Sequence, residues 1–468
     1  MSDARPKDYQ PRIPIYPRSV KGRFRGLKWG ILVLAYGVYF LLPWLRWTRE
    51  HGAHQAVLFD LPGRRFYVFD LVVYPQDIFW LAGFLMIAAV LLFLVTALAG
   101  RVFCGYFCFQ TLWTDVYMLI ERVVQGERPA RIRLDKQPWS GEKILKKGVT
   151  HALWLLTAFT TGLTFVLYWA DAPVLVQQFF TGEAPFPAYA TTFFLTATTY
   201  VMAGLAREQV CTYMCPYARF QSVMFDRDTL IVSYDEQRGE GSQGRAKLGA
   251  GLKDRAERQA KGVGDCIDCG YCVQVCPTGI DIRDGLQYQC IHCALCVDAC
   301  DTVMDKMKWP RGLIRYTSEN SLEGRPTRLF KLKNIGYGLT LAIMVVLLMW
   351  SIISQPQLDA SVAQVRQPLF VQLSDGSIQN SYEIKINNKT QRTVSILIDI
   401  DGLEGAILDT GRIDVVNLHP EQGTTVLARV RYQVADPDVR QRDLNFRIVP
   451  QDQSEIEILE LATHFHSP

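Results

Sequence analysis

Eight of the twelve cysteines in this sequence lie in two short runs that share one spacing. The first run, DCIDCGYCVQVCPTG, has the pattern C-x2-C-x2-C-x3-C-P, and the second, QCIHCALCVDACDT, repeats it with Asp301 in place of the proline. Thiolates crowded at two-residue gaps can each bind one iron of a cubane cluster, and this spacing is typical of the bacterial ferredoxin motif. The two runs therefore predict iron–sulfur chemistry.

The same pattern predicts which cysteines share a cluster. In a motif of this kind the fourth cysteine binds the neighbouring cluster, so we expect two 4Fe–4S clusters with exchanged fourth ligands. The first cluster is assigned to Cys266, Cys269, Cys272 and Cys300. The second cluster is assigned to Cys290, Cys293, Cys296 and Cys276. Two zinc ribbons are the alternative, but they need separated pairs of ligands rather than four crowded thiols in each run.

The other four cysteines form two C-x3-C pairs, Cys104 with Cys108 and Cys211 with Cys215. Each pair directly follows a long apolar run. On an α-helix, positions i and i+4 share a face, so each pair would point its thiols one way. If the two helices pack together, four thiols converge on a site that could bind copper, bind a third cluster or relay electrons. The alternative is that they are buried cysteines acting as small apolar side chains.

The elements that must position these cysteines include five apolar runs of about 20 residues, the length of a membrane-spanning helix. They cover 27–45, 78–99, 149–170, 186–206 and 335–354. The hydrophobic content of 49% is high for a soluble chain and agrees with this reading. No cleaved signal peptide is expected, because about 26 polar and basic residues precede the first run.

Lysine and arginine predict the orientation of these spans, since short positive loops stay in the cytoplasm. Eight basic residues lie in 1–28 and nine in 101–148, whereas 171–185 contains none. We therefore expect a multi-pass protein of the bacterial inner membrane, with its N-terminus and cluster motifs in the cytoplasm. The segment after the last span would then be periplasmic. All twelve cysteines would face the reducing cytoplasm, where structural disulfides are rare.

The expected organisation is a multi-domain membrane protein with a helical bundle, a cytoplasmic ferredoxin domain and an all-β domain. The segment 360–468 alternates apolar and polar residues between turn residues, as in SYEIKINNK, and predicts an immunoglobulin-like sandwich. The predicted parts are a cytoplasmic tail at 1–26, four transmembrane helices within 27–225, a solvated charged linker at 226–262, a two-cluster ferredoxin domain at 263–310, a fifth transmembrane helix at 335–354 and the periplasmic sandwich at 360–468.

The order of these motifs resembles a known family. GRVFCGYFCFQTLWTD, then VCTYMCPYARFQSVM, the doubled cluster motif, a fifth span and a terminal β-domain resemble the FixG, RdxA or CcoG family of cytochrome c oxidase accessory proteins. The resemblance implies a cupric reductase that supplies Cu(I) for assembly of a cbb-type oxidase. It implies that the eight motif cysteines bind clusters and that Cys104, Cys108, Cys211 and Cys215 carry the copper or redox chemistry.

The expected reaction is single-electron transfer from an unidentified cytoplasmic donor, through the two clusters, to Cu(II). Expected partners are the lipid bilayer, copper delivery or export proteins and oxidase assembly factors, with no nucleic acid; a homodimer is left open. One alternative is an electron-transfer subunit that links the quinone pool to a periplasmic reductase, and copper dependence would separate the two. Another is a scaffold whose β-domain docks on oxidase subunits and whose clusters are structural.

Overall fold

The computed structural model describes residues 14–49, 52–249, 251–390, 392–411, 415–420, 422–434, 440–451 and 456–468. The chain divides into two compact units. The first comprises 1–45, 55–66 and 74–348, and the second comprises 46–54, 67–73 and 349–468. Half of the tail expected at 1–26, residues 1–13, lies outside the described residues.

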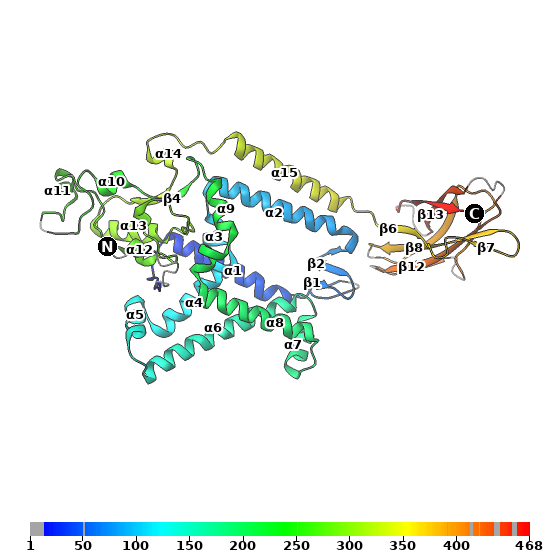
Figure 1. Cartoon of the computed structure of the whole chain (residues 1–468), viewed down its shortest axis with the longest axis horizontal. Helices are drawn as coiled ribbons and strands as arrows, with labels where there is room; N and C mark the ends of the chain where they lie inside the picture. Colours follow the sequence, from blue (N-terminus) through cyan, green and yellow to red (C-terminus); the bar gives the residue numbers. More distant parts are fainter. Residues whose placement is uncertain are drawn as a thin grey trace, which may run out of the picture. The chain divides into compact units, whose positions relative to one another are not determined.

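The first unit is mainly helical (Figure 1). Its bundle region contains α1 (Arg23–Leu41), η1 (Leu42–Trp44), η2 (Pro75–Asp77), α2 (Ile78–Ala99), α3 (Val102–Tyr106), α4 (Phe109–Gln125), α5 (Arg128–Lys136), α6 (Gly141–Leu167), α7 (Ala172–Thr181), α8 (Phe186–Thr199), the π-helical segments η3 (Tyr200–Ala206) and η4 (Val210–Met214), and α9 (Pro216–Met224). Three short strands lie between α1 and α2 in the sequence: β1 (Val57–Asp60) in the first unit, β2 (Arg65–Val68) at the boundary of the division, and β3 (Leu71–Val73) in the second unit.

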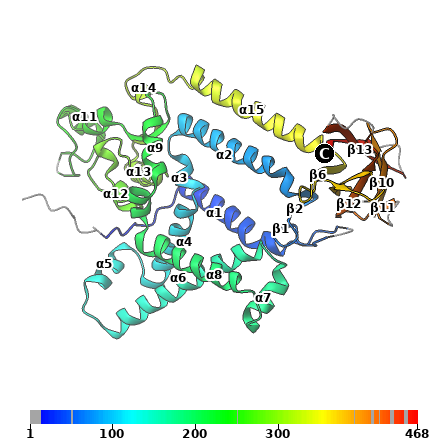
Figure 2. The ribbon, with the colours of Figure 1, turned by 45° about the vertical axis from the view of Figure 1, so that its right-hand side comes forward.

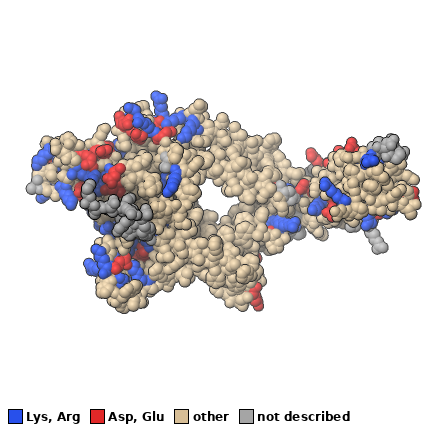
Figure 3. All heavy atoms as spheres, in the orientation of Figure 1, with Lys and Arg blue, Asp and Glu red and all other residues tan. Residues whose placement is uncertain are grey.

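Four helices within the described ranges are long and apolar enough to cross a membrane. They are α1 with η1, α2, α6 and the later helix α15 (Leu332–Ile353). None of the most apolar stretch of α15 is buried against the protein, and only 6% of that of α2 is. Figure 3 shows no charged side chain over α2 or the middle of α15, whereas charges gather over the ends of the helices and the cluster region. These surfaces suit the hydrocarbon core of a bilayer.

The span expected at 186–206 is not one continuous α-helix. The α-helical part, α8, has 14 residues, and η3 continues it with π-helical hydrogen bonding. The close packing of α8 on α6 depends on Gly162, where a Cβ atom would stand 2.6 Å from the carbonyl oxygen of Thr192. Figures 1 and 2 both show these helices side by side. The change from α-helix to π-helix comes shortly before the second C-x3-C pair. Because π-helical turns often occur at functional sites, it favours a functional role for this pair.

The cluster region of the first unit combines short helices with one two-stranded sheet. It contains β4 (Ile231–Tyr234), α10 (Glu236–Glu240), α11 (Arg255–Ala260), α12 (Tyr271–Val275), η5 (Ile282–Asp284), α13 (Leu295–Met307), β5 (Ile314–Thr317) and α14 (Glu319–Leu322). The antiparallel pair β4 and β5 places residues from before and after the cysteine motifs side by side.

The solvated linker expected at 226–262 is instead folded into the cluster region. The reason lies in Arg258, which is fully buried and donates hydrogen bonds to the carbonyl oxygens of Gly264 (2.9 Å) and Cys266 (2.8 Å). Its guanidinium also lies over the ring of Trp309. A buried arginine needs such partners, so this segment is held against the first cysteine motif rather than left in solvent.

Helix α13 docks on the start of α1. The carboxylate of Asp298 accepts hydrogen bonds from the backbone N–H groups of Phe24 (3.2 Å) and Arg25 (2.7 Å). The first N–H groups of a helix have no partner within the helix, and a carboxylate there also favours the helix dipole. A side chain of the cluster region therefore caps a helix of the bundle and fixes the two together.

The second unit is a sandwich of antiparallel strands. One sheet has the order β10-β12-β8-β6, with β7 also paired to β8, and the other has the order β11-β9-β13-β14. The strands are β6 (Leu358–Gln364), β7 (Val371–Gln372), β8 (Ile378–Asn388), β9 (Val394–Asp401), β10 (Ile407–Asp409), β11 (Val415–Leu418), β12 (Gly423–Tyr432), β13 (Gln441–Pro450) and β14 (Leu459–His466). Alternate residues such as Tyr382, Ile384 and Ile386 are fully buried, as the alternating sequence predicts.

Candidate metal centres

The two ferredoxin motifs have matching backbones. Asp268 and His292, each just before the second cysteine of its motif, have φ angles of 46° and 50°. Gly270 and Ala294, each just after that cysteine, have φ angles of 63° and 58°. Three of these four residues are not glycine, and a left-handed conformation is costly for them. The same turn is therefore built twice, and each turn leads into the helix that carries the third cysteine, α12 or α13.

The structure brings the eight motif cysteines to two neighbouring cavities. The first is lined by the four thiols predicted for the first cluster, Cys266, Cys269, Cys272 and Cys300. The second is lined by the four predicted for the second cluster, Cys276, Cys290, Cys293 and Cys296, together with Cys272. Four thiols at an otherwise apolar cavity are the donor set that a 4Fe–4S cluster takes, so the residues present fit two such clusters. The individual ligand roles stay predictions.

These thiols are poor ligands until a metal deprotonates them. Burial raises the pKa of Cys272 and the pKa of Cys290, each to about 12. Metal sites bind the thiolate, so loading the cavities must release protons. Before a cluster binds, the cavities therefore favour the neutral form of these thiols.

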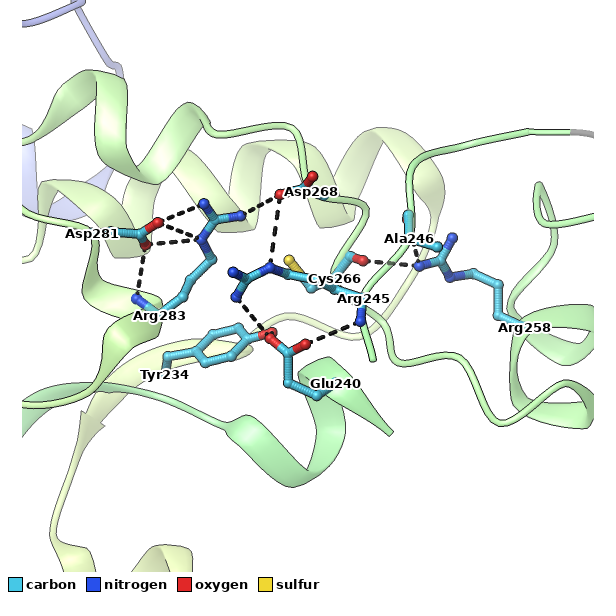
Figure 4. Close-up of polar contacts among 9 residues, drawn as sticks. All are labelled: Tyr234, Glu240, Arg245, Ala246, Arg258, Cys266, Asp268, Asp281 and Arg283. Atoms are coloured by element: carbon cyan, nitrogen blue, oxygen red, sulfur yellow. Dashed lines mark hydrogen bonds and ion pairs between the residues drawn. The ribbon is translucent and has the colours of Figure 1, made fainter. Parts of the chain in front are cut away.

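Arg283 lines the first cavity and belongs to a group of charged side chains that contact one another near Cys266 (Figure 4). Arg283 donates to Asp268 (2.7 Å) and to Asp281 (2.6 Å), and these contacts, through the hydrogen bond with Asp281 first, raise its pKa. Arg245 pairs with Glu240 at 2.9 Å. Arg283 also interacts electrostatically with Cys272, whose pKa it lowers against the larger effect of burial. The positive charge of Arg283, which Asp268 and Asp281 hold in place, therefore lies beside the cavity in which a negatively charged cluster would bind.

Contrary to the expectation from the sequence, neither C-x3-C pair lies on one continuous α-helix. Cys104 lies on α3 and Cys211 on the π-helical segment η4, and a wide turn then leads to the second cysteine of each pair. In the first pair the N–H of Cys108 donates to Phe103 O (3.0 Å), and in the second the N–H of Cys215 donates to Val210 O (2.8 Å). Both bonds span five residues. The second cysteine of each pair then becomes the N-cap of the next helix, α4 or α9. The physical reason in the second pair is Pro216, which has no N–H and is favoured at the first position of a new helix.

The turns also begin alike. The residue four positions before the first cysteine has a positive φ in both, 58° at Gly100 and 45° at Arg207. Arg207 is held in this costly conformation by its side chain, which binds Glu121 through two nitrogens at 3.1 and 2.5 Å. The two C-x3-C segments are therefore a structural repeat.

The four thiols of the two turns lie in one neighbourhood. Burial first, and then the nearby thiols of Cys108 and Cys104, raise the pKa of Cys211 to about 12. Burial raises the pKa of Cys104 to about 11, with smaller contributions from Cys108 and Cys215. The thiols of the two pairs therefore lie near enough to affect one another's pKa, as expected from the sequence. Among the residues with described positions, however, no three His, Cys, Asp or Glu side chains are close enough to hold a single metal ion.

Two buried polar groups near these thiols were missed by the sequence reasoning. Gln221 is fully buried, its Oε1 lies 3.2 Å from the Cys104 sulfur, and its Nε2 donates to Thr96 at 3.1 Å. Asp115 binds both Arg25 (3.1 Å) and Lys28 (3.0 Å). In the sequence, the only indication of this role is that Gln221 lies six residues after Cys215. A single glutamine after a motif predicts nothing unless its partners Cys104 and Thr96 are known.

Three protein families match parts of the chain. A "4Fe-4S dicluster domain" matches residues 206–319, and a "4Fe-4S binding domain" matches residues 81–125. An "IG-like fold at C-terminal of FixG" matches residues 348–468. These matches confirm the predicted pair of 4Fe–4S clusters and the immunoglobulin-like domain. The match at 81–125 includes Cys104 and Cys108.

Three curated relatives are similar over most of their length. Nitrogen fixation protein FixG of Rhizobium meliloti (strain 1021) is 38% identical over 98% of this chain and 94% of its own length. Protein RdxA of Cereibacter sphaeroides is 44% identical over 85% of this chain and 84% of its own length. Protein RdxB of the same organism is 47% identical over 81% of this chain and 80% of its own length.

Proposed function

Because this chain belongs to the family of FixG, RdxA and RdxB, an iron–sulfur oxidoreductase family, we propose that it reduces Cu(II) to Cu(I) at a membrane surface. The Cu(I) would serve the assembly of a cbb-type cytochrome c oxidase. The observation that supports this proposal most strongly is that Cys104 packs in one apolar cluster with Cys293 of the second ferredoxin motif, while Cys108, Cys211 and Cys215 lie near enough to influence one another or Cys104 electrostatically. Thiolates favour Cu(I) over harder ions, so such a site would stabilise the product.

The residues of this chain have three tasks in the proposed reaction. The eight motif cysteines hold two clusters, which supply one-electron carriers when bound. The apolar walls around them exclude water. The two wide turns present four thiols to copper, which is the substrate and not a resident cofactor. The electron comes from a low-potential cytoplasmic donor, and each electron converts one Cu(II) into one Cu(I) without proton transfer.

The proposed placement follows the distribution of charge. The N-terminus and the cluster region would face the cytoplasm, and the second unit would face the periplasm of a bacterial inner membrane. Copper delivery or export proteins and oxidase assembly factors would receive the Cu(I). An immunoglobulin-like domain on the outer side would suit the binding of such partners.

The test is anaerobic mixing of pre-reduced, purified protein with Cu(II), with Cu(I) detected by a chelator. A Cys108→Ser, Cys215→Ser double variant with unchanged iron content is expected to lose Cu(I) formation. A Ser361→Ala variant, on strand β6 of the second unit, is the control. If the double variant formed Cu(I) at the wild-type rate, copper would be reduced elsewhere. No Cu(I) from fully reduced wild-type protein would instead favour an electron carrier with another acceptor.

A further inference from the structure

Helix α3, which carries Cys104, lies directly against the second ferredoxin motif. A Cβ atom on Gly105 would stand 2.7 Å from the carbonyl oxygen of Ile291 and 3.0 Å from the Cα atom of Cys293. Both of these atoms belong to the backbone, so they could not turn aside as a flexible side chain could. The approach therefore requires glycine at position 105.

Two buried hydrogen bonds hold this contact on either side of Gly105. The Tyr106 hydroxyl donates to the carbonyl oxygen of Cys293 (3.0 Å), and the backbone N–H of Arg101 donates to Nδ1 of His292 (3.0 Å). Both donors come from the segment that carries Cys104, and both acceptors come from the loop between Cys290 and Cys293. The C-x3-C turn and the ferredoxin loop are thus fixed to one another.

One thiol of each C-x3-C pair faces the second motif. Cys104 packs in one apolar cluster with Ile291 and Cys293. Cys211 lines a small cavity whose walls also include Pro277 and Ile291. The two turns therefore converge on Ile291 of the second motif, and Cys211 also lies near Pro277, which follows Cys276, the first-motif cysteine assigned to the second cluster.

The first motif is placed differently. Its cavity, like that of the second cluster, is lined by residues of the cluster region, so the difference lies in the exposure of the cysteines. Each motif has two buried cysteines, but Cys269 of the first motif is exposed, whereas Cys296 and Cys300 of the second motif are half-buried. A donor protein in solution can thus approach the first motif at Cys269, whereas the second motif makes the close backbone contact with helix α3.

We propose that electrons enter at the first ferredoxin motif and leave from the second, and that Gly105 is the positioning residue that keeps the second motif close to the thiol site. This inference rests on the proposed function for its acceptor, Cu(II). Each transfer takes one electron from the reduced ferredoxin region and reduces one Cu(II) to Cu(I), and the cytoplasmic donor then replaces that electron.

The test compares Gly105→Ala with wild type in two readouts that do not depend on turnover alone. The first is the electron paramagnetic resonance (EPR) spectrum of the reduced protein, with signals assigned by a Cys269→Ser variant that perturbs the first cluster. The second is the rate at which Cu(II) oxidises the pre-reduced clusters in stopped-flow absorbance. Gly148→Ala is the matched control, because no atom lies within 4 Å of its added Cβ.

Gly105→Ala is expected to alter the signal of the second cluster, leave that of the first unchanged, and slow oxidation by Cu(II) several-fold at full iron content. Reduction of the clusters by dithionite should keep its wild-type rate. If Gly105→Ala lowers iron content, Tyr106→Phe removes only one hydrogen bond and is expected to change the same signal to a smaller degree.

Two results would overturn the inference. One is an unchanged second-cluster signal in both variants. The other is wild-type oxidation by Cu(II) in a Gly105→Ala protein that retains all its iron. Failure of the proposed function would give a different result: the clusters of the wild-type protein would stay reduced in the presence of Cu(II). The EPR comparison would then still decide whether Gly105 positions the second motif.

Discussion

At the scale of single residues, the charge of Arg283 beside the first thiol cavity leads to a prediction about potential. Arg283→Gln is expected to lower the reduction potential of the first cluster, because the reduced cluster is the more negative form and loses a nearby positive charge. The expected change is on the order of 1 kcal/mol, or about 40 mV for one electron. A redox titration followed by EPR measures it.

The control for this prediction is Arg311→Gln, which removes an exposed arginine paired with Asp305 at 2.6 Å. Its effect on both potentials should be within error. Equal shifts in the two variants would mean that Arg283 acts only through the net charge of the protein.

The left-handed residues of the two motifs give a second residue-scale prediction, with opposite signs at equivalent positions. Gly270→Ala should destabilise the loaded first motif by about 1 kcal/mol. The added Cβ has room, but the φ angle of 63° is unfavourable for any residue other than glycine. Ala294→Gly should stabilise the second motif by up to about 1 kcal/mol. Cluster loss in increasing chaotrope measures both, and the same sign for both changes would contradict the argument.

The sequence was most informative at this scale. The spacing of the cysteines was enough to predict both ferredoxin motifs and to single out Cys104 and Cys211 with their pair members. It was not enough to find Gly105 or Gln221, whose importance comes from partners more than 100 positions away in the chain. Contacts of that kind leave no local pattern.

At the scale of elements, the buried ion cluster between α1 and α4 leads to a prediction about stability. Burial favours the neutral acid, but Lys28 and Arg25 outweigh it and hold the pKa of Asp115 below its usual value. Asp115→Asn leaves the buried Lys28 and the half-buried Arg25 without this charged partner, a change that costs about 3 to 5 kcal/mol. The free energy of unfolding in mild detergent measures this cost.

Asp305→Asn is the matched control, because Asp305 and its partner Arg311 are exposed, and exposed ion pairs contribute little to stability. A cost for Asp115→Asn as small as that of the control would show that water or another anion already compensates Lys28 and Arg25.

Elements were predicted less completely than residues. Helices α2, α6 and α15 correspond to apolar runs that the hydropathy of the sequence predicts directly. The π-helical turns were not foreseen. Within η3, Gly204 packs closely against Trp154 and Tyr117, which are distant in the sequence. The segment 226–262 has the composition of a solvated linker, yet one buried side chain, Arg258, is enough to fold it onto the first motif.

At the scale of the whole molecule, the order of the parts along the chain was predictable from sequence: apolar bundle, paired cysteine motifs, last apolar helix and β-sandwich. What could not be predicted is that the repeated C-x3-C turns meet the second ferredoxin motif rather than the first. That contact makes electron transfer from the ferredoxin region to the thiol site the central claim for the molecule.

The measurement that tests this claim most directly is an anaerobic count of Cu(I) formed against clusters oxidised, in protein reduced fully and then freed of reductant. Two one-electron clusters predict about two Cu(I) per chain, formed in step with the return of the oxidised cluster absorbance. Substitution of Cys104, Cys108, Cys211 and Cys215 by serine should abolish both changes while both clusters remain. Clusters that stay reduced in excess Cu(II), or Cu(I) that forms without cluster oxidation, would contradict the account.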